Sequence, residues 1–269
     1  MLIAALVSFF QVVTLLGSGL TVFKLLTSGL YRRYRIFFAY FVFRVPYAAS
    51  VLILTHIGQG TKSREFFYLF MYSEPLLMLF YILVVVELYG LVLEQYKGLY
   101  TLGRWAMYAA VLVSVTVSVL TLLPKLAPTM KEPSRKLMYE IAAERGVDFS
   151  LVIFILLIVL FLSRYPVPLS RNVVVHTGIY SIFFLSNTLA LLLRTVMGWN
   201  ASDLVSLCLT ALSAVCSVAW WLLLSAKGED VQVNAPHPGA GSEERILQQL
   251  DSINATLMKV SRPKHDVFR

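Results

Sequence analysis

Seven long runs of apolar residues, separated by short polar stretches, constrain this chain more than any other feature. A helix needs about 20 apolar residues to cross the hydrocarbon core of a bilayer. A lipid-facing barrel would instead alternate polar and apolar residues along each strand. The sequence therefore predicts an all-α, polytopic transmembrane helical bundle with seven spans. The runs are Leu2 to Phe23, Ile36 to Ile57, Phe66 to Tyr89, Trp105 to Leu123, Phe149 to Ser163, Val173 to Leu193 and Leu204 to Leu224.

The composition excludes an ordinary soluble domain. Of the 269 residues, 58% are hydrophobic and only 14% are charged, whereas soluble domains carry about 25% charged residues. The net charge of +8 is spread between the apolar runs, which indicates contact with lipid headgroups and argues against nucleic acid as a partner. The shortest run is Phe149 to Ser163, and we expect a helix start near Met138 to lengthen it.

Lysine and arginine residues near the ends of the spans predict the orientation. None precedes the first run, which also lacks the features of a cleaved signal peptide. Four follow it, so we expect that connection in the cytoplasm and the N-terminus outside a cell membrane. Seven spans then place the C-terminus in the cytoplasm. The connection before Phe149 opposes this rule, because it is external and also basic. The four basic residues that follow the first run are Lys24, Arg32, Arg33 and Arg35.

Beyond the last span, the chain changes character. We expect residues 1–225 to form the transmembrane domain, residues 226–241 a flexible linker rich in glycine and proline, and residues 242–269 a cytoplasmic amphipathic tail. In this tail, apolar residues recur at alternating spacings of four and three and form one apolar face, which we call the seam. The seam predicts a helix that pairs with a second copy as a short coiled coil, lies on the membrane surface, or docks on a cytoplasmic partner. The seam consists of Ile246, Leu250, Ile253, Leu257 and Val260.

Charged residues inside spans are costly and mark interior or functional positions. Arg44 and Glu87 are expected at equal depth on consecutive antiparallel spans, which predicts an ion pair. Such a pair is either a structural clamp or a switch. Glu74 precedes Pro75, which frees the carbonyl of Met71. This arrangement is either a helix kink with a neutral, hydrogen-bonded Glu74 or a site for a cation or proton.

Other polar side chains complete the predicted interior. Tyr81, seven residues after Glu74 on the same helical face, is a candidate hydroxyl partner for Glu74, as is Tyr47. His176 and Asn187 are the remaining polar candidates in the sixth run. A stripe of small hydroxyl residues in the last run is expected to point into the bundle, with a permeation path as the alternative. The stripe consists of Ser202, Ser206, Thr210, Ser213 and Ser217.

No sequence motif indicates a reaction. The nucleophile elbow, the zinc-protease motif, the phosphate-binding loop and the dinucleotide fingerprint are all missing from the sequence. We therefore predict no catalytic residue, no cofactor and no metal site. We predict that the chain is a non-catalytic sensor or signalling protein whose lipid-embedded charges set a conformational equilibrium. A small transporter or channel is the alternative, and a membrane-embedded enzyme is the third possibility.

Overall fold

The computed structural model describes residues 2–57, 64–94, 96–122, 132–164, 169–197, 202–230, 232–233, 248 and 251–257. Seven long α-helices make up most of the described chain, so the helical fold class is confirmed. They are α1 (Leu2–Thr27), α2 (Arg35–Ile57), α3 (Arg64–Val92), α4 (Lys97–Leu122), α5 (Glu132–Arg164), α6 (Arg171–Met197) and α7 (Ser202–Leu223).

Short elements complete the fold. Two 3-10 helices, η1 (Leu30–Arg32) and η5 (Ala226–Gly228), follow α1 and α7. Strands β1 (Leu169–Ser170) and β2 (Gln232–Val233) form an antiparallel pair. A further helix covers residues 251–257.

Within the described residues, five helices are long and apolar enough to cross a membrane. In α5, the apolar part is the shorter segment Gly146–Leu160. This helix begins at Glu132, before the start near Met138 that the sequence suggested. The five spanning segments are Ala5–Thr27, Arg35–His56, Arg64–Val92, Arg171–Ala190 and Leu204–Leu223.

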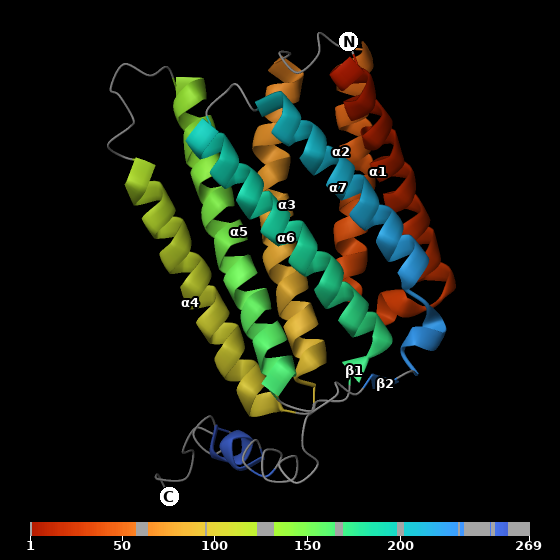
Figure 1. The fold of residues 1–269 in the computed structure, drawn as a ribbon, viewed down its shortest axis with the longest axis vertical. Coiled ribbons are helices and arrows are strands. Elements are labelled where there is room, and N and C mark those ends of the chain that lie inside the picture. Colours follow the sequence, from red (N-terminus) through yellow and green to blue (C-terminus); the bar gives the residue numbers. More distant parts are fainter. Residues whose placement is uncertain are drawn as a thin grey trace, which may run out of the picture.

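The seven helices run alternately up and down (Figure 1). We call the end where α1, α3, α5 and α7 terminate the lower end, as drawn in Figure 1. Contacts connect α1, α2, α3, α5, α6 and α7 into a closed ring, because α7 packs against α1. Helix α4 lies outside the ring, mainly against α5. The N-terminus lies at the upper end, and helix 251–257 lies below the bundle.

Small residues bring α1 and α7 close together. A Cβ atom added to Gly17 would lie only 3.1 Å from Cβ of Ser217. The hydroxyl of Thr21 donates to the carbonyl oxygen of Ser217 at 3.3 Å. Such close approach favours helix association in lipid, where both helices are already solvated by apolar chains. Ser217 is fully buried, and Thr210 and Ser213 line an internal cavity, which confirms that this part of the hydroxyl stripe faces inward.

An aromatic core fills the lower half of the ring. The indole of Trp220 is 1% exposed and contacts the rings of Phe37, Phe41 and Tyr180 at centroid distances of 5.5, 5.5 and 4.9 Å. Its position near the end of a span also suits a residue at the membrane interface. The burial shows instead that Trp220 belongs to the core, because it lies on the face of α7 that points into the ring.

Candidate functional site

A central cavity of about 300 Å³ lies inside the ring of six helices. Every ring helix contributes to its wall, whereas none of the described side chains of α4 does. Glu74 lies ten residues after the start of α3 at Arg64, which corresponds to about 15 Å from the upper end. The cavity is therefore near mid-depth of the bundle. It is lined by Gln11, Thr14, Arg44, Tyr47, Ala48, Val51, Glu74, Leu77, Tyr81, Glu144, Phe183, Asn187, Leu209, Thr210 and Ser213.

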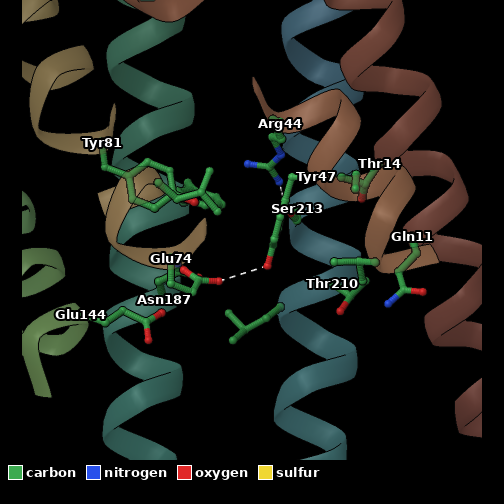
Figure 2. Close-up of a pocket in the computed structure, with 15 residues that line it drawn as sticks. Gln11, Thr14, Arg44, Tyr47, Glu74, Tyr81, Glu144, Asn187, Thr210 and Ser213 are labelled. Carbon is green, nitrogen blue, oxygen red and sulfur yellow. Dashed lines mark hydrogen bonds between the residues drawn. The ribbon is translucent and has the colours of Figure 1, made fainter. Parts of the chain in front are cut away.

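The cavity brings together four of the six polar residues predicted from the sequence. Arg44, Glu74, Tyr81 and Asn187 all line it, although they come from three different helices. Glu87 and His176 do not line it. Figure 2 shows Arg44 beside Ser213 on one side, and Glu74, Asn187 and Glu144 together on the other. The cation and the two carboxylates thus lie on different parts of the wall.

Arg44 is held by neutral groups. Its guanidinium donates to the hydroxyls of Tyr40 and Ser213, and only 8% of the residue is exposed. It also lies over the rings of Tyr40 and Phe183, at 5.4 and 6.0 Å from their centroids. These contacts add hydrogen-bond and cation–π stabilisation to a buried cation. Within the described part of the chain, no carboxylate forms an ion pair with Arg44.

The predicted ion pair between Arg44 and Glu87 is therefore wrong. The Glu87 carboxylate accepts hydrogen bonds from the backbone N–H groups of Ile36 and Phe37 at 2.9 and 3.0 Å. These are unpaired donors of the first turn of α2, where an anion also suits the helix dipole. Arg44 lies eight residues farther along α2, about 12 Å above this level. The two helices pack with an offset that the sequence does not reveal.

Glu74 receives a hydrogen bond from the hydroxyl of Tyr47 at 3.3 Å, drawn as a dashed line in Figure 2. One of the two hydroxyl partners suggested by the sequence is thus in contact, while Tyr81 lies on the wall of the same cavity. Pro75 is accommodated inside α3. Like Arg44, Glu74 forms no ion pair with any described residue.

His176 is a packed core residue. Its ring is 2% exposed and contacts Phe37, Tyr34 and Tyr180 at centroid distances of 4.3, 4.8 and 6.1 Å. Among the described residues, no group of three His, Cys, Asp or Glu side chains is arranged to hold a metal ion. The aromatic packing accounts for the burial of this histidine.

Two acidic residues of α5 were not among the site residues predicted from the sequence. Glu144 lines the cavity, and Asp148 is only 2% exposed. Both lie before the apolar run Phe149 to Ser163, in the part of α5 that precedes it. The signal was present in the periodicity, because Glu144, Asp148 and the buried residues Leu151 and Ile155 follow one another at spacings of four, three and four, which place them on one helical face.

A second polar group, which we call the lower-end cluster, joins the segment after α7 to two other connections. It consists of Arg33, Tyr34, Asn172, Ser225 and Glu229. Glu229 accepts hydrogen bonds from the hydroxyl of Tyr34 at 2.5 Å and the amide of Asn172 at 2.6 Å, and lies 3.1 Å from Nε of Arg33. Burial, with the bond to Glu229, raises the pKa of Tyr34. The phenol therefore stays protonated and keeps donating at neutral pH.

The described part of the tail contacts its own chain. The side-chain oxygen of Asn254 accepts a hydrogen bond from the backbone N–H of Gly98 at 2.8 Å, and a Cβ atom added to Gly98 would lie 2.9 Å from that oxygen. Helix 251–257 thus docks where α4 begins, a contact that the sequence pattern does not predict. Ile253 remains 46% exposed. Ile246, Leu250 and Val260 of the predicted seam lie outside the described residues.

Comparisons with protein-family models, with curated proteins and with solved structures find no match for this chain.

Proposed function

We propose that this chain is a non-catalytic, seven-span membrane receptor that senses a small polar ligand in its central cavity and passes the signal to its cytoplasmic tail. The observation that carries this proposal is the cavity itself. Its wall brings Arg44 and Glu74 to mid-depth of the bundle, and neither forms an ion pair with a described residue. Buried charges without a direct ion pair are costly, so a ligand that supplies oppositely charged partners would favour the conformation that encloses it.

An aromatic path supports a link from the cavity to the lower end. Arg44 contacts Tyr40, whose ring lies 5.1 Å from that of Phe41. Phe41 contacts Trp220 at 5.5 Å, and the core around Trp220 continues through Phe37 and His176 to Tyr34 of the lower-end cluster. A shift of Arg44 on ligand binding would therefore press on packed side chains that extend to the segment leading into the tail.

For the tail, we propose that its apolar seam binds a second copy of the chain or a cytoplasmic partner. Asn254 of the tail contacts Gly98 at the start of α4. Ligand binding would release the tail by breaking this contact. Crosslinking in membranes, with the full chain and with a chain that lacks Ser242 to Arg269, tests this output. We expect deletion to abolish the crosslinked species. Unchanged assembly after deletion would remove the tail from the mechanism.

The proposed topology adds α4 and α5 to the five apolar helices and places the lower end in the cytoplasm of a cell. Lys24, Arg32, Arg33 and Arg35 lie at that end, as the distribution of positive charge requires. In a Cys208→Ser, Cys216→Ser background, a membrane-impermeant maleimide should label Glu65→Cys on intact cells. Arg32→Cys should react only after permeabilisation. Both positions are exposed, so the reverse pattern would invert the topology.

Ligand sensing itself is tested with purified full-length protein in lipid nanodiscs. A broad set of water-soluble metabolites is screened for compounds that raise the melting temperature. A ligand at about 100 times its Kd stabilises a protein by about 2.7 kcal/mol. We expect Ala48→Leu, which fills space at the cavity wall, to abolish the shift, and Ala49→Leu, outside the wall, to retain it. A shift that survives Ala48→Leu would place binding elsewhere, and a screen without any hit would refute the receptor proposal.

Two prolines favour a second candidate function, a small secondary transporter. Pro46 in α2 and Pro75 in α3 lie within two residues of Arg44 and Glu74. Each proline removes a helical hydrogen bond, and broken helices often surround transporter binding sites at mid-membrane. Uptake of a stabilising compound into proteoliposomes, lost in Glu74→Gln, would establish transport. Binding without uptake would support the receptor.

A further inference from the structure

The central cavity carries charges of both signs, and they are separated along the bundle axis. Among the described residues that line the cavity, Arg44 is the one cation, and Glu74 and Glu144 are the acids. The contact between Ile36 and Glu87 sets a common level for α2 and α3. From that level Arg44 is eight residues along α2 and Glu74 is 13 residues along α3, so Arg44 is about 8 Å nearer the lower end.

Within the described part of the chain, no side chain bridges the two charges. Arg44 is bonded to Tyr40 and Ser213, and Glu74 is bonded to Tyr47, all of them neutral hydroxyls. Figure 2 shows Arg44 and Glu74 on separate parts of the wall. Each charge is therefore available to a molecule that occupies the space between them.

A ligand with a single charge fits this wall poorly. An anion bound at Arg44 would stand opposite the carboxylates of Glu74 and Glu144, and an ammonium bound at Glu74 would share the cavity with the guanidinium of Arg44. At low dielectric such like charges repel strongly. A molecule with both charges, oriented with its anion toward the lower end, meets a complementary partner at each end.

We propose that the ligand is a small zwitterion, with a carboxylate or similar oxyanion at Arg44 and Ser213 and an ammonium at Glu74. This inference rests on the receptor proposal, because it names the ligand class of the same cavity. A volume of about 300 Å³ accepts a molecule the size of an amino acid. The aromatic walls of Tyr47, Tyr81 and Phe183 add favourable contacts for an ammonium group.

The test uses the full chain in nanodiscs and three matched sets of probes at millimolar concentration. The first contains the protein L-amino acids and ω-amino acids of increasing length. The second contains carboxylic acids of the same length without the amine, and the third contains amines without the carboxylate. We expect one or more zwitterions to raise the melting temperature and the matched single-charge compounds to leave it unchanged.

Matched variants test which residues bind the two charged groups of the ligand. Arg44→Gln and Glu74→Gln should each weaken binding of the zwitterion by about 30-fold or more, as expected when one partner of a desolvated charge pair is removed. Arg64→Gln and Glu65→Gln make the same changes at the exposed start of α3 and should leave affinity unchanged. If a cavity variant fails to fold, the probe comparison on the unmodified chain still decides the ligand class, and Ala48→Leu locates the site.

The outcomes separate this inference from the receptor proposal. Equal stabilisation by an amine alone, or by a carboxylate alone, would overturn the zwitterion and leave a receptor with a ligand of one charge. Failure of all three probe sets, while the broad screen yields an uncharged ligand blocked by Ala48→Leu, would overturn the zwitterion in the same way. If that screen also fails, both proposals fall.

Discussion

Replacing Trp220 with alanine is expected to lower the free energy of unfolding by about 3 kcal/mol or more. The indole is 1% exposed and contacts the rings of Phe37, Phe41 and Tyr180. In lipid, transfer of an apolar group from water contributes little, so the loss comes from packing. A void on the order of 130 Å³, at about 24 cal/mol per Å³, gives this magnitude.

The measurement is reversible unfolding in mixed micelles, followed by far-ultraviolet circular dichroism, which does not depend on the removed fluorophore. Trp105→Ala is the matched control, because Trp105 is 65% exposed on α4 and its removal creates no internal void. We expect the control to lose far less stability. Equal losses in the two variants would show that Trp220 is not the centre of the packed core.

Glu87→Ala is expected to lower the free energy of unfolding by about 3 to 6 kcal/mol. The carboxylate accepts two backbone hydrogen bonds at the start of α2, and hydrogen bonds to charged groups contribute about 1.5 to 3 kcal/mol each. Glu87→Gln retains one acceptor oxygen and should lose less. Glu94→Ala, which removes only an exposed pair with Arg33 at 3.3 Å, should change stability by less than about 1 kcal/mol.

A double-mutant cycle with Arg44 gives this prediction a second readout. The two side chains have separate partners, so the losses in Arg44→Ala and Glu87→Ala should add to within about 0.5 kcal/mol in the double variant. A coupling energy well above 1 kcal/mol would contradict the packing offset between α2 and α3. It would restore the ion pair that the sequence alone suggested.

Several site residues were predictable because burying charge in lipid is costly. Arg44, Glu74, Tyr81 and Asn187 stand out as polar residues within apolar runs, and all four line the cavity. Glu144 and Asp148 were missed because they lie outside the apolar run, in the polar first part of α5. Helix ends are set by capping and packing in addition to hydropathy, so the start of this span was the least predictable.

The sequence by itself determined that the chain is helical and where the apolar helices lie, because a hydrocarbon environment requires every backbone group to be paired within a long apolar segment. Only the tertiary structure decided which polar residues meet. Helices α2 and α3 are offset by about two turns, so Glu87 contacts the start of α2 and not Arg44. The rotation of α7 about its axis places Trp220 in the core. Both quantities depend on how side chains of different helices interlock, which hydropathy along one helix does not encode.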